Sequence, residues 1–556
     1  MAFALFVALA QFGCSRAWAQ LTTAREAELV VTGWLSADPQ PLGTKLGRRV
    51  ANVAAFADDN GEPLYYVVYL LPSGFVVVPA DDLVEPIIAF ADDATYDLSL
   101  ENPLAALVIA DLNARVAAVR AELSPQAEVR AFTVCRAQQK WHHFIALADS
   151  TKNKFAATDL GSISDARVEP LVESKWHQND VCEKLCYNYY TPNNYYCGCV
   201  ATAMAQLMRY HRHPNSGIGA HEFTIKVDGT SQAALTIGGD GHGGPYYWSD
   251  MPLDPNCYTT DAQRRAIGAI CYDAGVSVNT EYESDGSGAN TLKTKDALTN
   301  TFKYSNAIKG FRAGDDIGPG LIGMVNPNLD YKHPVILGLW REGGGHAVLC
   351  DGYGYNASTL YHHLNMGWAG NDDAWYNLPD VDADLYTYTS VVACTYNIFV
   401  SGTGEIISGR VTDASGYPVS TATVTAVGKG GPFNTTTNAK GIYALANVAS
   451  ASTYTVRVAK TGYMFTDRFV KTGTSSDETD ISGNKWEIDF VGILIGDCDA
   501  DGDVDIADLA MFGLAWLAKP GDAGWNPACD IGTPANDFID TMDFAVFANN
   551  WQVGVK

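Results

Sequence analysis

A cysteine that stands directly before a run of helix-forming residues is the feature that most restricts this chain. Residues 197–206 read Cys-Gly-Cys-Val-Ala-Thr-Ala-Met-Ala-Gln, so Cys199 opens the run and Gly198 supplies a tight turn before it. At a helix N-terminus, backbone N–H groups and the helix dipole favour thiolate over thiol. Because the thiolate is the nucleophilic form, this arrangement prepares Cys199 for covalent chemistry. Cys197, one step before the turn, is expected to be structural.

A second signal lies far downstream, where three glycines precede a histidine. Residues 343–349 read Gly-Gly-Gly-His-Ala-Val-Leu. The glycines let a substrate backbone approach closely, and the apolar residues that follow would hold the histidine rigidly. An imidazole can take a proton from a thiol and return it to a leaving group. Among 11 histidines, His346 is therefore the candidate base, whereas His211 and His213 are expected to pack on the helix after Cys199.

The chain is too long for a single hydrophobic core, so several domains are expected. Its 556 residues are 47% hydrophobic and 18% charged, an ordinary globular balance. The net charge of −26 argues against nucleic acids and anionic membranes as partners. In a first unit, the pattern predicts strands at residues 65–71, 74–79 and 86–90 and a helix at 105–121.

Residues 1–19 are expected to be a signal peptide. A short apolar run is followed by small residues at positions 17 and 19, with Gln20 as the new N-terminus. The run is too short to cross a bilayer, and no later segment is long and apolar enough for a transmembrane anchor. We therefore expect a secreted or cell-surface-associated protein.

The cysteine count fits an oxidising compartment. Removal of Cys14 with the signal peptide leaves an odd number from the 12 cysteines, which fits one unpaired thiol plus disulfides. A zinc site at Cys182, Cys186 and Cys197 is the alternative, but no second closely spaced Cys or His pair completes it.

Beyond a linker-like stretch at residues 401–404, the pattern changes to short alternating strands. Residues 406–412, 423–427 and 454–458 are predicted strands separated by turn residues. This spacing is typical of a small β-sandwich, expected over residues 405–492.

The last segment carries two acidic loops. In the first, oxygen ligands at positions one, three, five, nine and twelve with glycine at six match a calcium loop, and a helix over 509–517 follows. The second copy is two residues longer and lacks the glycine. The candidate calcium ligands are Asp497, Asp499, Asp501, Asp503, Asp505 and Asp508, and then Asp530, Asn536, Asp540 and Asp543. Cys498 and Cys529 lie beside the first ligand of each copy, where a disulfide would pair the two loops.

Four motifs follow one another in the central part of the chain. Residues 169–178 contain Pro-Leu and end in Lys-Trp-His-Gln, and residues 198–206 carry the cysteine. Residues 344–353 contain Gly-Gly-His-Ala and Asp-Gly-Tyr, and residues 365–370 read Asn-Met-Gly-Trp-Ala-Gly. Together they resemble the streptopain family of papain-like cysteine peptidases.

The resemblance extends beyond the central part and implies a multidomain architecture. Residues 74–82 resemble the inhibitory propeptide of the family, the strands after residue 405 resemble a carboxypeptidase regulatory-like domain, and the acidic loops are similar to a dockerin type I module. The implied order is an α+β propeptide over 20–165, an α+β papain-like peptidase over 166–400, an all-β sandwich over 405–492 and a small α-helical calcium-loop module over 493–556.

The resemblance also implies roles for single residues. The side chain of Gln178 would join the N–H of Cys199 in an oxyanion hole, and Trp368 would shield the histidine. Asn365 is the candidate that would orient the histidine, with a nearby backbone carbonyl as the alternative. Met366 replaces the first tryptophan of the family's loop, which affects the shape of the cleft. The candidate catalytic residues are therefore Cys199, His346, Gln178, Asn365 and Trp368.

The resulting hypothesis is a secreted cysteine endopeptidase made as a zymogen, cut within about residues 130 to 168. It implies protein or peptide substrates, structural Ca²⁺ in the last module, no cofactor for catalysis, and a cohesin-like or cell-surface docking partner. One alternative is a catalytically inactive peptide-binding relative. The other is a Cys-His acyl transferase of transglutaminase type, whose third residue would normally be Asp rather than Asn365.

Overall fold

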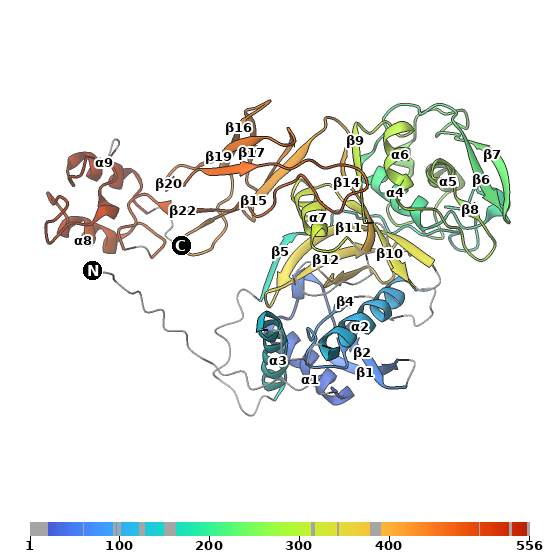
Figure 1. Cartoon of the computed structure of the whole chain (residues 1–556), viewed down its shortest axis with the longest axis horizontal. Coiled ribbons are helices and arrows are strands. Elements are labelled where there is room, and N and C mark those ends of the chain that lie inside the picture. Colours follow the sequence, from blue (N-terminus) through green and yellow to red (C-terminus); the bar gives the residue numbers. More distant parts are fainter. Residues whose placement is uncertain are drawn as a thin grey trace.

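The computed structural model describes residues 21–58, 61–92, 96, 102–121, 128–149, 163–312, 317–341, 344–378, 391–499, 501–532 and 536–552. The predicted signal peptide lies outside these residues. The chain forms an N-terminal unit (21–149), a central unit (163–399), a sandwich (405–494) and a C-terminal module (495–552). Figure 1 shows the N-terminal unit below the central unit, with the sandwich leading away to the C-terminal module at the far left.

The N-terminal unit is an antiparallel sheet flanked by helices. Its first helix begins where Thr23 and Glu26 form a reciprocal capping box. The predicted strands and helix fall on β2, β3, β4 and α2. The elements are α1 (Ala24–Ala37), β1 (Arg49–Ala57), β2 (Pro63–Leu71), β3 (Phe75–Pro79), β4 (Ala89–Ala91), α2 (Pro103–Ala121) and α3 (Glu128–Ala148).

The central unit has a helical part that surrounds α4 and a sheet part that carries β11. Its helices are α4 (Cys199–His211), α5 (Asp261–Ser277), α6 (Lys293–Asn300) and α7 (Gly320–Asp330). Its strands are β5 (Ser164–Val168), β6 (Glu222–Val227), β7 (Thr230–Leu235), β8 (Glu281–Tyr282), β9 (Asn306–Phe311), β10 (Val335–Arg341), β11 (Gly344–Asn356), β12 (Thr359–Asn365), β13 (Ala374–Tyr376) and β14 (Val391–Phe399). Short 3-10 helices lie at Pro41–Gly43, Pro192–Asn194, Trp248–Asp250 and, in the C-terminal module, Pro527–Cys529.

One sheet runs through both the N-terminal and the central units. Its strand order is β1-β2-β3-β4-β13-β12-β11-β10-β14-β9, and β5 pairs with β11. The two units join where Phe90 of β4 pairs with Trp375 of β13. Buried residues from both sides, such as Val77 and Leu337, belong to one hydrophobic cluster. The two units therefore share a core as well as a sheet.

The sandwich consists of two four-stranded sheets, β18-β15-β22-β20 and β17-β16-β19-β21. The predicted strands fall on β15, β16 and β19. The strands are β15 (Glu405–Asp413), β16 (Thr423–Gly428), β17 (Phe433–Thr436), β18 (Ile442–Val448), β19 (Thr453–Ala459), β20 (Tyr463–Met464), β21 (Arg468–Lys471) and β22 (Phe490–Leu494).

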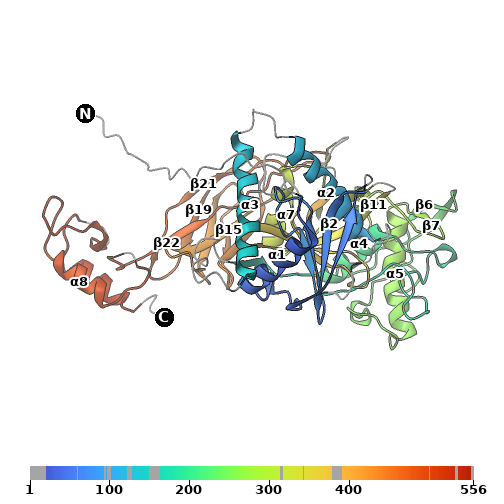
Figure 2. The same cartoon turned by 90° about the horizontal axis from the view of Figure 1, so that it is seen from below.

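The sandwich packs directly against the central unit and is not connected to it by a free linker alone. The N–H of Phe311 donates to the carbonyl of Thr479 at 3.0 Å. The guanidinium of Arg410 lies 2.7 Å from the carboxylate of Asp165 in β5. Figure 2 shows the sandwich beside α7, with the C-terminal module standing apart.

The C-terminal module contains α8 (Ile506–Leu514) and α9 (Thr541–Asn549) around a small core that includes Phe512 and Phe547. Helix α8 starts three residues earlier than predicted, because Asp505 and Asp508 form a capping box there. The sulfurs of Cys498 and Cys529 lie 2.9 Å apart as free thiols, so the structure places the expected partners together without a bond. No helix in the described part of the chain is long and apolar enough to cross a membrane.

Candidate active site

Cys199 is the first residue of α4, and the turn before it depends on glycine. Gly198 has φ of +91°, which is unfavourable for other residues, and a Cβ there would lie 2.8 Å from the carbonyl oxygen of Ser287. The helix that follows is buried from Val200 to Met208, which fixes its position. The nucleophile is therefore held by a tight turn and a rigid helix.

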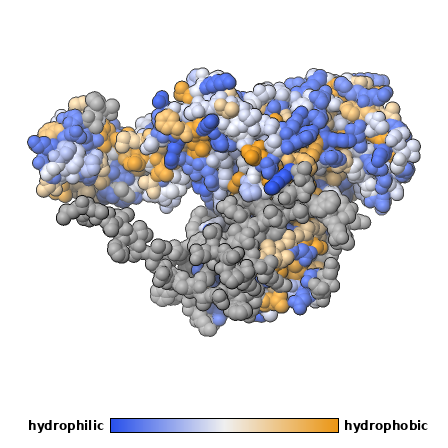
Figure 3. Space-filling view, viewed as in Figure 1, coloured by the Kyte–Doolittle hydropathy of each residue, from blue (hydrophilic) through white to orange (hydrophobic). Residues whose placement is uncertain are grey.

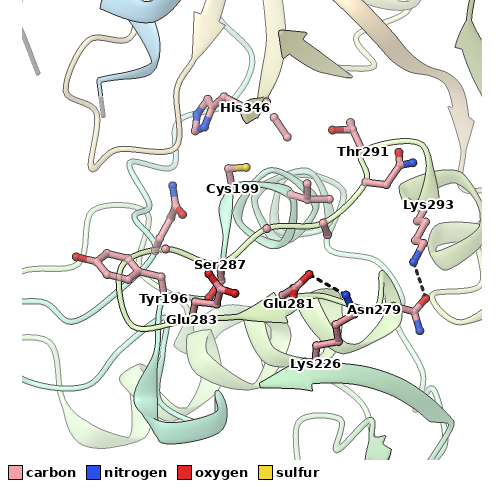
Figure 4. Close-up of a pocket in the computed structure, with 18 of the residues that line it drawn as sticks. Tyr196, Cys199, Lys226, Asn279, Glu281, Glu283, Ser287, Thr291, Lys293 and His346 are labelled. Carbon is pink, nitrogen blue, oxygen red and sulfur yellow. Dashed lines mark hydrogen bonds and ion pairs between the residues drawn. The ribbon is translucent and has the colours of Figure 1, made fainter. Parts of the chain in front are cut away.

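His346 faces this thiol from strand β11. It is mostly buried, at 9% exposure, and it pairs with Leu339 of β10. Its Nε2 lies 2.9 Å from the carbonyl oxygen of Met366. Because a carbonyl only accepts, Nε2 carries the hydrogen and Nδ1 is the basic nitrogen of the neutral ring. In Figure 4, His346 lies just above Cys199 at the upper end of the pocket.

The electrostatics of this pair favour the thiolate. Burial by itself raises the pKa of the Cys199 thiol, but the charge and hydrogen bond of His346 and the N–H groups of Ala347 and Val200 outweigh it. The net result is a pKa below the ordinary cysteine value. The neighbouring Cys197 is fully buried, and its sulfur lies 3.3 Å from the hydroxyl of Thr202, in keeping with the structural role expected for it.

The hydrogen bonds of Asn365 go to groups other than the imidazole, which favours the backbone-carbonyl alternative. Its amide donates to the carbonyl of Ser174 at 3.0 Å, and its Oδ1 accepts from Gln206 at 2.8 Å and from the N–H of Gly367 at 3.1 Å. The imidazole is held by the backbone carbonyl of Met366 instead. A side-chain motif does not reveal such a contact, because any residue offers that carbonyl.

Gln178 and Trp368 both line the pocket beside the Cys–His pair. The carbonyl of Gln178 accepts from the N–H of Cys197 at 2.8 Å, which holds this glutamine close to the nucleophile turn. Trp368 packs edge-on against His177, with ring centroids 6.3 Å apart. His177 belongs to the Lys-Trp-His-Gln motif, but no role was predicted for it. Burial lowers its pKa, which favours the neutral ring in the cleft wall.

The pocket is a cavity of about 1260 Å³ that runs from the Cys–His pair towards β6 and β8. Its far wall is polar: Lys226 and Glu281 form an ion pair at 3.1 Å, and Lys293 donates to Asn279 at 3.2 Å. A glycine-rich loop after β8, residues 283–290, forms the side next to Gly198. Sequence reasoning missed this loop, although its glycines were a visible signal.

Cysteines 182, 186 and 197, considered above as zinc ligands, are one disulfide-bonded cysteine and two buried free cysteines. Cys182 is joined to Cys257 by a disulfide, with sulfurs 2.01 Å apart. Cys186 is buried, and burial raises the pKa of its thiol to about 12. Because the disulfide removes Cys182 as a thiolate ligand, the structure does not support a zinc site made of these three cysteines.

The first acidic loop of the C-terminal module gathers carboxylates. One oxygen from each of Asp497, Asp499, Asp501 and Asp508 lies within 4.8 Å of the others. Asp503 and Asp505 form a second group with Asp508. In the second loop, Asp543 accepts from the N–H groups of Ile531, Gly532 and Asp540, much as Asp508 accepts from Cys498, Asp499 and Asp505. Asp530 accepts from Asn536 and Asp537.

Family models match three parts of the chain. Residues 176–376 match the peptidase C10 family, residues 19–116 match the Spi protease inhibitor, and residues 406–481 match the carboxypeptidase regulatory-like domain. These ranges coincide with the central unit, most of the N-terminal unit and the sandwich.

Curated relatives match the central unit. Streptopain of Streptococcus pyogenes serotype M1 is 28% identical over 189 residues, which is 33% of this chain and 45% of streptopain. The thiol protease/hemagglutinin PrtT of Porphyromonas gingivalis is 29% identical over 185 residues, 33% of this chain and 20% of PrtT. The match thus spans less than half of either relative. A solved fragment of Prevotella intermedia prointerpain A is 21% identical with a TM-score of 0.44, covering 63% of this chain and 98% of the fragment. Residues 176–376 therefore resemble the peptidase C10 family, and they stand between a segment that matches the Spi protease inhibitor and one that matches the carboxypeptidase regulatory-like domain.

Proposed function

We propose that this chain is the zymogen of a cysteine endopeptidase that hydrolyses peptide bonds through an acyl-enzyme. The observation that carries the proposal is the Cys199 thiol, whose pKa is lowered at the start of α4 beside His346. The thiolate attacks the scissile carbonyl, and the imidazolium returns its proton to the leaving amine. Water, activated by the same imidazole, then hydrolyses the thioester and restores the thiol.

The oxyanion of the tetrahedral intermediate would be held by two donors, the N–H of Cys199 and the side-chain amide of Gln178. Support comes from the place of Gln178 in the pocket wall and from its backbone contact with Cys197. One preorganised donor of this kind is worth about 3–4 kcal/mol of barrier in other hydrolases.

The zymogen part of the proposal rests on the inhibitor match of residues 19–116 and on the sheet that the N-terminal unit shares with the central unit. Activation would cut the chain between α3 and β5, within the predicted range of about residues 130 to 168. Strand β5 would stay with the mature enzyme, because it pairs with β11. The resulting enzyme would act on proteins or peptides outside the cell.

For the C-terminal module we propose structural Ca²⁺ and a docking role. Carboxylate oxygens are the ligands that Ca²⁺ prefers, and the first loop supplies four within reach of one ion. Apolar side chains on α8 and α9, including Leu514 and Met542, are exposed, and Figure 3 shows hydrophobic residues interrupting the hydrophilic surface of this module. A cohesin-like or cell-surface partner would cover them.

A thiol-reactive epoxide and denatured casein test the proposed reaction. The activated wild-type chain should be labelled at Cys199 and should cleave casein, and Cys199→Ala should do neither. Labelling without cleavage would favour an acyl transferase, and no labelling after activation would favour an inactive peptide-binding relative. Equal cleavage by wild type and Cys199→Ala would contradict the mechanism.

A further inference from the structure

Gln206 lies on the same helix as the nucleophile, two turns further on, and its side chain is almost fully buried at 1% exposure. Its Oε1 accepts from the hydroxyl of Ser174 at 2.9 Å and from the N–H of Trp176 at 3.2 Å. Its Nε2 donates to Oδ1 of Asn365 at 2.8 Å. The side-chain amide of Gln206 thus joins three parts of the structure. These are helix α4, the segment that precedes Gln178, and the end of β12.

Asn365, which accepts from Gln206, also makes hydrogen bonds to backbone groups. Its Oδ1 also accepts from the N–H of Gly367 at 3.1 Å, and its Nδ2 donates to the carbonyl of Ser174 at 3.0 Å. Asn365 itself is 3% exposed, so these hydrogen bonds are shielded from water. In such surroundings, the loss of one partner leaves a buried polar atom unsatisfied.

The peptide group between Met366 and Gly367 connects Asn365 to the imidazole. The N–H of Gly367 is held by Asn365, and the carbonyl of Met366 on the same peptide accepts from Nε2 of His346 at 2.9 Å. A trans peptide is planar, with its N–H and C=O pointing in opposite directions. When one end is fixed, the direction of the other end is fixed as well.

We propose that Gln206 and Asn365 form a buried amide relay that orients the His346 imidazole through the Met366–Gly367 peptide group. Both are positioning residues: neither touches the thiol, and each acts through the peptide. The relay accounts for a papain-like asparagine that does not bond to its histidine. It also accounts for Met366 in place of tryptophan, because the contact with His346 uses the backbone carbonyl of that residue. This inference rests on the proposed function.

The decisive readout is the pH dependence of Cys199 alkylation by iodoacetamide in the activated full-length chain. Gln206→Leu and Asn365→Leu should release the carbonyl, free the imidazole to rotate, and move the alkylation midpoint towards that of an ordinary thiol. In casein cleavage, kcat should fall by about 100-fold while KM changes little, as expected for misplacement of a catalytic group. Asn365→Asp keeps the acceptor for Gly367 but loses the donor to the carbonyl of Ser174, so its kcat should lie between that of Asn365→Leu and that of the wild type.

Two further variants separate the relay from general destabilisation. Asn328→Leu removes another fully buried amide, which bonds to Met324 and Asn397, and should lower stability without moving the alkylation midpoint. Gln206→Glu keeps an acceptor for Ser174 and loses the donor to Asn365, so it tests the link if Gln206→Leu fails to fold.

The outcomes distinguish the relay from the proposed function. If the wild type neither cleaves casein nor is alkylated at acidic pH, the proposed function itself is wrong. If the wild type does both, and folded Gln206 and Asn365 variants keep its alkylation profile and kcat, the relay alone is overturned.

Discussion

At the scale of single residues, the turn before the nucleophile sets the strictest requirement. Gly198→Ala would place a β-carbon on a residue with φ +91° and ψ 152°, a conformation nearly confined to glycine, at a cost of about 1–3 kcal/mol, and against the carbonyl of Ser287. We expect a lower Tm and a loss of casein cleavage, because the turn must shift and Cys199 moves with it. Thermal unfolding and kcat measurements on the purified chain check this.

The matched control is Gly513→Ala in α8, outside the pocket. A β-carbon at Gly513 meets no atom within 4 Å, and its φ is not in the left-handed region, so this variant should keep the kcat of the wild type and should not lower the Tm. Equal losses in both variants would mean that the effect is not specific to the turn at Gly198.

Local chemistry made part of the site predictable. Cys199 and His346 could be chosen because a helix start and a glycine run are visible in the sequence. The partner of the imidazole could not, because the carbonyl of Met366 leaves no side-chain signal. Gln206 belongs to the motif that carries Cys199. The sequence alone does not show whether its side chain is buried or exposed, because this depends on how the helix packs.

At the scale of elements, the positions of strands were easier to predict than which strands pair with each other. The pattern located β3 and β4, but the pairing of β4 with β13 joins segments far apart in the chain and follows from packing of the whole sheet. Helix α2 adds contacts where the N-terminal and central units meet, since Arg115 donates to the side chain and the backbone carbonyl of Asn377. The N-terminal unit is thereby part of the same sheet as β11, which carries His346.

Because the N-terminal and central units share a sheet and a core, we predict that cleavage between α3 and β5 does not by itself release the N-terminal unit. The shared core and sheet should keep the two fragments together on size-exclusion chromatography under native conditions. Arg115→Ala should speed their separation, because hydrogen bonds from a charged group contribute about 1.5–3 kcal/mol each. Arg25→Ala, at an exposed ion pair, should not. Immediate separation of the wild-type fragments would contradict the prediction.

At the scale of the whole molecule, the sandwich and the central unit meet around a buried carboxyl. Residues 401–404 have a linker-like composition, but the composition of a linker does not show whether the domains on its two sides pack against each other. Asp330, at the end of α7, accepts from the hydroxyl of Tyr353 at 2.7 Å and lies beside Ser408 of the sandwich. Burial, which these hydrogen bonds only partly oppose, raises the pKa of Asp330 from 3.8 to about 7.

The raised pKa of Asp330 makes the stability of the contact between the sandwich and the central unit depend on pH. The folded state holds the proton of Asp330 more tightly than the unfolded state, so its contribution is fully present below about pH 4 and is lost as pH rises through 7. Between pH 5 and pH 8 the loss amounts to about 3 kcal/mol. Asp330→Asn removes the ionisation, so its Tm advantage over the wild type should grow from pH 5 to pH 8. The exposed Asp254→Asn should follow the wild type throughout, and parallel curves for Asp330→Asn and wild type would show that Asp330 does not control this contact.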